Sequence, residues 1–159
     1  EESMAGPSHK PTHRVGAFAV IFDDGGKVLV SRRVDSGWFN LPGGGVEPDE
    51  SVPEGLIREV CEETGLDVEV GRLVGVYSKP QKHELVLVFR ARVTGGSLTP
   101  SDEADYHAWV SPEELDQVKL LPKHRERIDD ALRDAPVAVI KDQREPSLTA
   151  ADAEAIGGM

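Results

Sequence analysis

Residues 44–66 read GGVEPDESVPEGLIREVCEETGL, and they contain the strongest helix prediction in the chain. Ser51 suits the N-cap position, and Glu54 three residues later completes the pattern of a capping box. Gly65 is a natural C-terminal stop. An apolar stripe recurs at helical spacing, made up of Leu56, Ile57, Val60 and Cys61. The sequence therefore predicts an amphipathic helix that ends at Gly65.

The polar side of this helix carries three carboxylates. Glu59, Glu62 and Glu63 are spaced i, i+3 and i+4, which places them on one face, where like charges destabilise a helix by a few tenths of a kcal/mol per pair. Converging hard oxygen ligands are what Mg²⁺ or Mn²⁺ prefers. The preceding glycines, 43–45, allow the backbone to approach a metal or a phosphate closely. This combination predicts a divalent-metal site mounted on a rigid helix.

The whole stretch resembles the Nudix box, the sequence signature of a hydrolase family that includes the MutT-like enzymes. That box has a glycine, five residues, Glu, seven residues, Arg-Glu, an aliphatic residue, any residue, Glu-Glu, any residue, Gly and an aliphatic residue. Every defined position matches, at Gly44, Glu50, Arg58, Glu59, Val60, Glu62, Glu63, Gly65 and Leu66. The lead-in at 41–43 (Leu-Pro-Gly) is also similar to that of the family. The resemblance implies the Nudix fold, an α+β (α/β/α sandwich) domain with a mixed β-sheet flanked by helices.

Patterns outside the box predict the remaining elements. Apolar residues on both faces predict a strand at 15–22, and the turn Asp-Asp-Gly-Gly at 23–26 predicts a hairpin back along 27–33. Residues 38–45 are expected to be irregular, because they include one proline and three glycines. Further strands are predicted at 67–79, 84–93 and 106–110. Helices are predicted from Ser111, with a second capping box, and at 122–133.

Composition divides the chain into one domain and two terminal segments. We expect a flexible lead-in at residues 1–12, the Nudix domain at 13–135 and a partly disordered C-terminal tail at 136–159, which is rich in Ala, Pro, Asp and Glu. A chain of 159 residues is long enough for one such core.

Charge and cysteine content restrict the partners and the compartment. The net charge of −11 makes the chain a poor candidate for binding a nucleic-acid polymer. No apolar run approaches the roughly 18–20 residues that cross a bilayer. The single cysteine, Cys61, forms no internal disulfide, which fits a reducing, cytoplasmic setting. We expect a small-molecule nucleotide as partner and a monomer or a homodimer.

The resemblance implies roles for the box residues. Glu59, Glu62 and Glu63 would be metal ligands, together with the backbone carbonyl of Gly44. Mg²⁺ is the expected cofactor, with Mn²⁺ as a possible substitute. Arg58 would belong to the catalytic group by orienting the ligands through ion pairs, with Glu50 as its partner.

The general base stays open at this stage. A box glutamate, Glu62 or Glu63, is one candidate. Glu103 is another, because it lies in a stretch, DEADYHAWVSPEEL, that is similar to the late acidic loop, strand and helix of the family. Histidine is a common acid–base residue, but His83 and His107 are weaker alternatives, since isolated histidines are commonly structural.

Substrate phosphates require positive groups in this acidic protein. Arg32 and Arg33 end a predicted strand, and in a regular strand one of the two must face away from the other. Lys79 and Lys82 are lesser candidates. Phe39, with its neighbour Trp38, is positioned to stack on a base or to pack in the core.

The resemblance implies hydrolysis of a pyrophosphate bond, and the substrate remains to be chosen. Pro80 lies fifteen residues beyond Gly65, as in the ADP-ribose pyrophosphatase branch of the family. This favours ADP-ribose or a nucleotide sugar. A nucleoside triphosphate pyrophosphohydrolase of the MutT type is the alternative. A non-catalytic, nucleotide-sensing Nudix domain is less favoured, because such domains usually lose box carboxylates and this chain keeps them all.

Overall fold

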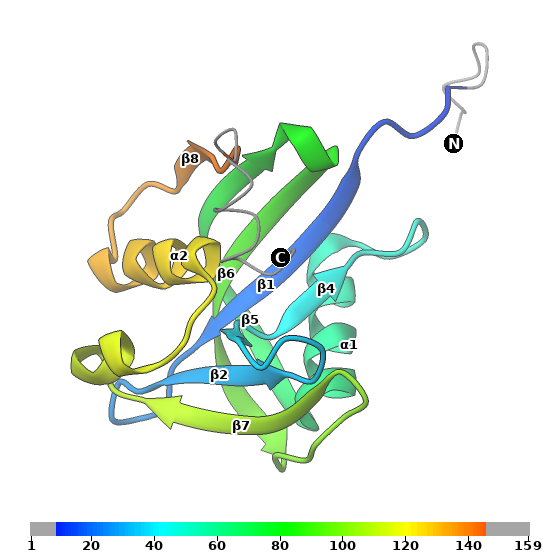
Figure 1. The fold of residues 1–159 in the computed structure, drawn as a ribbon. Helices are drawn as coiled ribbons and strands as arrows, with labels where there is room; N and C mark the ends of the chain where they lie inside the picture. The colour runs from blue at the N-terminus through cyan, green and yellow to red at the C-terminus, as the bar shows by residue number, and fades with distance from the viewer. Residues whose placement is uncertain (1–8, 146–159) are drawn as a thin grey trace.

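Two β-sheets and two α-helices make up the domain (Figure 1). The structure is a computed structural model, and it describes residues 9–145. The larger sheet has the order β4-β1-β6-β5-β8 and the smaller one β3-β2-β7. The larger sheet is mixed, because β1 runs parallel to β6 and β5 parallel to β8, whereas the other pairs are antiparallel. The predicted α+β fold with a mixed sheet flanked by helices is confirmed.

The element bounds follow the chain order. The strands are β1 (Arg14–Ile21), β2 (Val28–Arg33), β3 (Phe39–Asn40), β4 (Gly43–Gly45), β5 (Leu66–Lys79), β6 (Glu84–Gly96), β7 (Ala104–Val110) and β8 (Val139–Asp142). The helices are α1 (Val52–Thr64) and α2 (Pro122–Arg133), with short 3₁₀ helices η1 (Pro80–Lys82) and η2 (Pro112–Gln117). Within the described range, no helix is both long enough and apolar enough to cross a membrane.

Local interactions at both ends define α1. The Ser51 side chain accepts from the Glu54 backbone N–H, and the Glu54 carboxylate accepts from the Ser51 N–H at 2.8 Å, so the predicted capping box is present. Gly65 ends the helix with φ 82°, a left-handed conformation that glycine adopts without strain. The box helix therefore begins and ends where the sequence predicts.

The sheets separate two apolar cores. Leu56 and Val60 of α1 pack with the β1 residues Ala17, Ala19 and Ile21 on one side. Val20 of β1 faces the other side, where it joins side chains from β2, β5, β6 and α2. The prediction that β1 is apolar on both faces is thus confirmed. The predicted stripe on α1 is only partly buried, because Ile57 is 39% exposed and Cys61 lies on the surface.

The segment 38–45 is not irregular, as the sequence suggested, but contains β3 and β4. In β4 the glycines pair with β1, and a Cβ on Gly43 would lie 2.2 Å from the Ala17 carbonyl oxygen. Gly43 also has φ 150°. Glycine is needed here because the strands approach more closely than any side chain allows.

The predicted hairpin between 15–22 and 27–33 is wrong. β2 pairs with β3 and β7, and a single bridge between Phe22 and Val28 links it to the end of the first strand. Both edges of β1 are already occupied by β4 and β6. The turn itself forms as predicted, with the Asp23 carboxylate accepting from the backbone N–H groups of Gly25 and Lys27.

Two further elements differ from the sequence prediction. The helix from Ser111 is only the short η2, and the Ser111 hydroxyl donates to the Glu114 carboxylate rather than capping the backbone. The predicted tail contains β8, which pairs with β5. Residues 9–12 of the lead-in carry no helix or strand, and the rest of both terminal segments, 1–8 and 146–159, falls outside the described residues.

The burial of α1 predicts unequal effects of truncating two adjacent side chains. Leu56→Ala should lower the free energy of unfolding by about 2–5 kcal/mol, because Leu56 is fully buried. Ile57→Ala should cost less than about 1 kcal/mol, since Ile57 is substantially exposed. Urea unfolding of both variants measures the difference. Equal losses would contradict the packing described for α1.

Candidate active site

The acidic face of α1 lies against the glycine strand β4. Glu63 is 8% exposed, and its Oε1 accepts from the backbone N–H of Gly43 at 3.2 Å. A Cβ on Gly44 would lie 2.5 Å from the carboxyl group of Glu59. Both carboxylates therefore rest directly on the backbone of β4, and the approach of Glu59 is possible only because residue 44 is glycine.

Arg58 connects the box residues to one another. Its Nε and Nη2 donate to the two carboxylate oxygens of Glu50 at 2.6 and 2.9 Å, and Nη2 also donates to the Gly45 carbonyl at 3.1 Å. Its Nη1 donates to Glu59 at 3.3 Å and to Glu62 at 3.1 Å. The bidentate contact with Arg58 lowers the pKa of Glu50 to about 2. One guanidinium thus links α1, β4 and the loop that connects them.

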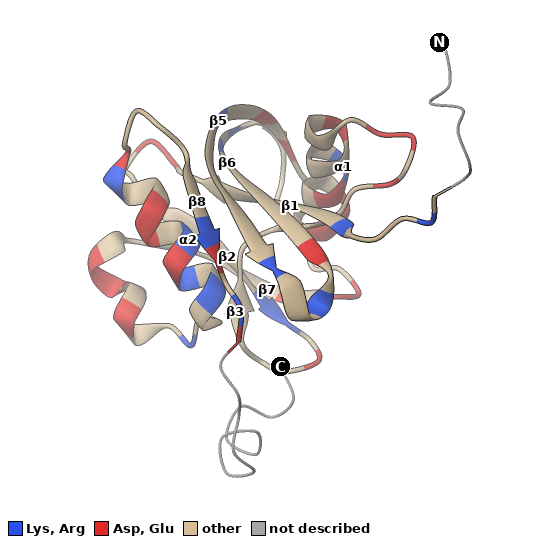
Figure 2. Cartoon of the chain, turned by 90° about the horizontal axis from the view of Figure 1, so that it is seen from above, with Lys and Arg blue, Asp and Glu red and all other residues tan. Residues whose placement is uncertain are grey.

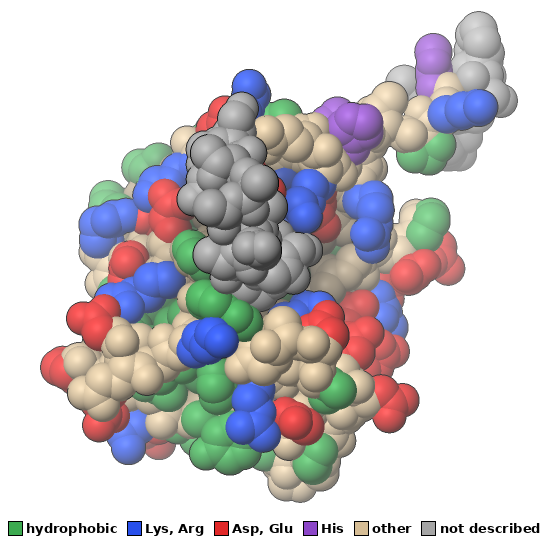
Figure 3. All heavy atoms as spheres, in the orientation of Figure 1, with side chains coloured by type: hydrophobic (Ala, Val, Ile, Leu, Met, Phe, Trp, Pro, Cys, Tyr) green, Lys and Arg blue, Asp and Glu red, His purple; other side chains and the backbone are tan. Residues whose placement is uncertain are grey.

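The carboxylates repel one another. Burial is the main reason that the pKa of Glu63 is raised to about 7. The nearby charges of Glu103 and Glu59 add to this rise, and the Gly43 N–H and Arg33 oppose it. Burial also raises the pKa of Glu59, with added repulsion from Glu62 and Glu103. The carboxylates of Glu59, Glu63 and Glu103 therefore lie near one another without enough positive charge nearby to balance their negative charges. Acidic side chains also gather along α1 and beside it on the surface (Figures 2 and 3).

This donor set suits a hard divalent cation. Carboxylate and backbone carbonyl oxygens are the ligands that Mg²⁺ and Mn²⁺ take, and a cation would relieve the repulsion. Across residues 9–145, no three His, Cys, Asp or Glu side chains are already arranged as a metal shell. Contacts with Arg58 and with the Gly43 N–H hold several of the oxygens, so metal binding requires them to turn.

Arg32 and Arg33 have different partners, although the register of β2 against β7 shifts between them, so the regular strand period does not apply at this step. The positive charge of Arg33 opposes the rise of the Glu63 pKa, and the Arg33 side chain forms an ion pair with Asp35. Arg32 instead donates to Asp105 at 2.9 Å and lies over the Tyr106 ring. Glu103 is held next to this end of β2, because its carbonyl accepts from Val34 N–H at 3.0 Å.

The predicted aromatic and histidine candidates have other contacts. Phe39 is partly buried against the core and meets Tyr106 edge-on, with the ring centroids 6.3 Å apart. Trp38 lies under the Lys119 ammonium. His107 uses both ring nitrogens, at 2.7 Å from the Ser31 hydroxyl and 2.8 Å from the Thr99 carbonyl.

The remaining candidates lie around η1. Lys79 pairs with Glu84 at 2.8 Å. Lys82 ends η1, and His83 follows it in a left-handed conformation. Pro80, which suggested the ADP-ribose branch, begins this short helix.

Sequence reasoning missed three polar residues near the site. Asn40 of β3 is 5% exposed, and its Oδ1 has no hydrogen-bond partner among the described residues. His124 and Arg127 of α2 are also buried. An asparagine within the apolar run Phe-Asn-Leu was a usable signal for the first, whereas the two α2 residues lie in a highly charged segment where burial is hard to foresee.

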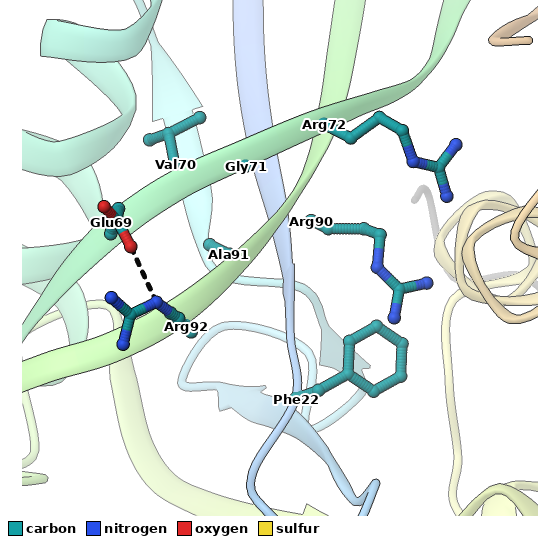
Figure 4. Close-up of a pocket in the computed structure, with 8 residues that line it drawn as sticks. All are labelled: Phe22, Glu69, Val70, Gly71, Arg72, Arg90, Ala91 and Arg92. Atoms are coloured by element: carbon teal, nitrogen blue, oxygen red, sulfur yellow. Dashed lines mark hydrogen bonds and ion pairs between the residues drawn. The ribbon is translucent and has the colours of Figure 1, made fainter. Parts of the chain in front are cut away.

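A separate hollow of about 380 Å³ lies over β5 and β6 (Figure 4). It contains no box residue, and the two arginines on its β6 side are already engaged. Arg92 donates to Glu69 at 2.6 Å, and Arg90 donates to the Ala131 carbonyl at 2.7 Å. Its lining residues are Phe22, Glu69, Val70, Gly71, Arg72, Arg90, Ala91 and Arg92.

Comparison with known families agrees with the geometry of α1 and β4. The NUDIX domain family matches residues 12–134, which include the whole box. The chain belongs to the NUDIX family. It is a Nudix pyrophosphohydrolase of the MutT-like kind, acting on nucleotides, and members of this family typically depend on divalent metal.

Three relatives illustrate the range of substrates. The chain is 38% identical over 122 residues to a MutT-like protein of Streptomyces ambofaciens, covering 77% of this chain and 79% of that one. It is 33% identical over 116 residues (72% and 77%) to a putative 8-oxo-dGTP diphosphatase of Bacillus subtilis. It is 37% identical over 128 residues (76% and 75%) to an ADP-ribose pyrophosphatase of Methanocaldococcus jannaschii.

The fold matches solved structures as well. A NUDIX hydrolase from Nitrosomonas europaea superposes with a TM-score of 0.77, at 21% identity, over 86% of this chain and 82% of that one. This likeness concerns the fold alone.

The buried Glu63 carboxylate predicts a pH-dependent stability of the metal-free protein. Folding raises the Glu63 pKa from 4.5 to about 7. The contribution of Glu63 to the free energy of unfolding is therefore present below pH 4.5 and is lost as the pH rises through 7. Glu63→Gln should therefore gain stability relative to the native protein between pH 5 and pH 8, by up to about 3 kcal/mol. Urea unfolding in chelator measures this gain.

The more exposed Glu62 provides the matched control, because its side chain is 61% exposed. Glu62→Gln should show little change of relative stability over the same pH range. A Glu63→Gln effect that did not vary with pH would contradict the burial argument.

Proposed function

We propose that this protein hydrolyses the pyrophosphate bond of a nucleoside diphosphate derivative, with ADP-ribose or a nucleotide sugar favoured, in a reaction that requires Mg²⁺. The observation that carries the proposal is that the box carboxylates are all present and that two of them, Glu59 and Glu63, rest on a glycine strand. The 37% identity to an ADP-ribose pyrophosphatase supports the substrate class, as does the position of Pro80.

The metal site is assigned to Glu59, Glu62, Glu63 and the backbone carbonyl of Gly44. A bound Mg²⁺, or Mn²⁺ as a substitute, would neutralise phosphate charge and lower the pKa of a bound water. The repulsion among the buried carboxylates supports this assignment, since a divalent cation removes it. Arg58 would act as a positioning residue, because it contacts Glu59 and Glu62 and not a reacting atom.

Glu103 is our preferred general base. Its charge raises the pKa of both Glu59 and Glu63, so it lies close to the metal site, and it is carried by a loop rather than by the box helix. From there it would accept the proton of the attacking water. Glu62 and Glu63 remain alternatives. His107 is disfavoured because both of its ring nitrogens are occupied.

Substrate contacts are proposed on β2 and β3. Arg33 would bind a phosphate, because its charge already acts on Glu63 at the metal site. Arg32 and Phe39 lie together beside Tyr106. That surface combines a guanidinium with aromatic rings, which suits the base or sugar part of a nucleotide.

A second candidate is a nucleoside triphosphate pyrophosphohydrolase of the MutT type. The relatives described as MutT-like and as a putative 8-oxo-dGTP diphosphatase favour it. A non-catalytic nucleotide sensor is disfavoured, because all box carboxylates are kept. For either enzyme we propose a free nucleotide as the substrate of a cytoplasmic monomer or homodimer. The net charge of −11 disfavours a nucleic-acid polymer.

A substrate panel tests the proposal. The protein is incubated with Mg²⁺, and separately with Mn²⁺, and ADP-ribose, nucleotide sugars, dATP, dGTP, 8-oxo-dGTP or diadenosine polyphosphates. Products are identified by mass, with a chelator control. We expect chelator-sensitive conversion of ADP-ribose to AMP and ribose 5-phosphate, or of a nucleotide sugar to a nucleoside monophosphate and a sugar phosphate.

Two variants separate metal chemistry from folding. Glu62→Gln should lower kcat at least about 100-fold, because even groups that only support metal ligands contribute 10–100-fold. Glu69→Gln, on the exposed side of β5, should leave kcat unchanged. Cleavage of triphosphates with ADP-ribose and nucleotide sugars untouched would establish the second candidate. No cleavage of any compound would overturn both.

A further inference from the structure

A buried histidine and a buried arginine of α2 lie behind the glycine strand. The Nδ1 of His124 accepts from the Leu41 backbone N–H at 3.0 Å, and the imidazole packs edge-on against Phe18 at 5.1 Å between centroids. Phe18 in turn adjoins the strand, since a Cβ on Gly43 would lie 2.6 Å from the Phe18 Cα. The Nε2 of His124 faces Nη1 of Arg127 at 3.5 Å.

This contact joins two hydrogen-bond donors. Because Nδ1 of His124 accepts a hydrogen bond, a neutral imidazole must carry its proton on Nε2. Burial and the charge of Arg127 hold the pKa of His124 well below its ordinary value, which keeps the ring neutral. A guanidinium has no acceptor atom. Neither group can therefore accept a hydrogen bond from the other. One oxygen placed against both N–H groups would accept a hydrogen bond from each.

The charge of Arg127 also lacks a counter-ion. Arg127 is 1% exposed, and its Nε and Nη2 both donate to a single neutral oxygen, Oε1 of Gln143, at 3.1 and 2.9 Å. Within residues 9–145, no carboxylate comes within 4.0 Å of the guanidinium. Nearby, Lys79 and Lys123 are paired with Glu84 and Glu145. The Phe18 and Tyr77 rings lie over the guanidinium, and the charges of Glu84 and Glu126 act on it without contact. Burial still lowers the Arg127 pKa, so an anion in direct contact would offset the remaining cost of burying this charge.

The segment that covers Arg127 is held mainly by polar contacts. β8 runs beside β5 (Figure 1), and the chain beyond it is fixed by bonds from Gln143 N–H to the Ser78 carbonyl and from Glu145 N–H to the Gln81 side chain. Val137 and Ile140 are 75% and 83% exposed, and Val139 is partly buried against the core, so this segment buries little apolar surface beyond one valine. Few buried apolar contacts mean a low free energy of local opening.

We propose that His124 Nε2 and Arg127 Nη1 form a binding site for a phosphate oxyanion, and that the strap, residues 137–145, opens to admit it. The phosphate replaces Gln143 as the partner of the guanidinium and places one oxygen between the two donors. This site uses no box residue and needs no metal, so it stands independently of the proposed substrate. Its phosphate comes either from free inorganic phosphate or from the phosphate group of a nucleotide.

Phosphate titration of the full chain in chelator tests the site, because without a cation the box carboxylates repel phosphate. The Arg127 Nε–H and His124 ring resonances are followed by ¹H–¹⁵N NMR, first with inorganic phosphate and then with AMP. We expect saturable shifts of both. Gln143→Ala should tighten binding about fivefold, because the phosphate no longer displaces a hydrogen-bonded side chain.

Variants of two neighbouring arginines provide the matched comparison. Arg127→Met should abolish the His124 shift and keep the fold, since replacing a buried charge by an apolar side chain of similar length is often neutral. Arg125→Met, on the same helix and paired with Asp116 and Asp129, should leave binding unchanged.

The outcomes separate the two phosphate sources. Saturation by inorganic phosphate assigns the site to free phosphate, and saturation by AMP alone assigns it to a nucleotide phosphate. No saturable shift with either compound, or a Gln143→Ala variant that binds no more tightly than the native chain, would overturn the proposal even if Arg127→Met failed to fold.

Discussion

The contact between the acidic face of α1 and the backbone of β4 is the constraint on which the rest of the site depends. The Glu59 carboxylate occupies the space that a side chain at Gly44 would fill, and the Glu63 carboxylate accepts a hydrogen bond from the Gly43 N–H. The same glycine strand pairs with β1 so closely that a Cβ on Gly43 would collide with the Ala17 carbonyl. Backbone that serves both as a sheet edge and as the floor of an acidic site cannot carry side chains. The family signature therefore fixes a packing distance as well as a set of ligands.

The remaining architecture keeps that contact rigid at some electrostatic cost. Leu56 and Val60 anchor α1 on β1 and β5, and Arg58 ties the helix to Glu50 and to the Gly45 carbonyl. These contacts hold like charges together in a partly buried place, where burial raises the pKa of Glu63 to about 7. A divalent cation bound there would relieve this repulsion, so the fold itself would contribute to the affinity for the cation.

The sequence predicted the box helix, which is determined locally. The bounds of α1 follow from Ser51, Glu54 and Gly65, whose caps involve neighbours in the chain. The second capping box, at Ser111, did not form, because that hydroxyl donates to the Glu114 carboxylate. Pairing partners were less predictable. β4 is a strand because β1 lies beside it, and the expected hairpin fails because both edges of β1 are occupied elsewhere. The pair of hydrogen-bond donors on α2 could not be predicted either. Whether Nε2 of His124 is a donor depends on Nδ1 accepting from the Leu41 N–H, which is a contact between distant parts of the chain.

The contact between the α1 carboxylates and β4 is tested most directly by adding a side chain to the glycine strand and measuring the metal affinity. Gly44→Ala places a methyl group where the Glu59 carboxyl lies, and that flexible side chain can move away without unfolding the domain. Gly25→Ala, in a turn whose nearest atom is 3.5 Å away, is the control. With Mn²⁺ binding followed by electron paramagnetic resonance, we expect Gly44→Ala to weaken binding at least about tenfold and Gly25→Ala to match the native protein. Equal affinity in all three proteins, with the folds intact, would contradict the account that β4 and the α1 carboxylates form the metal site together.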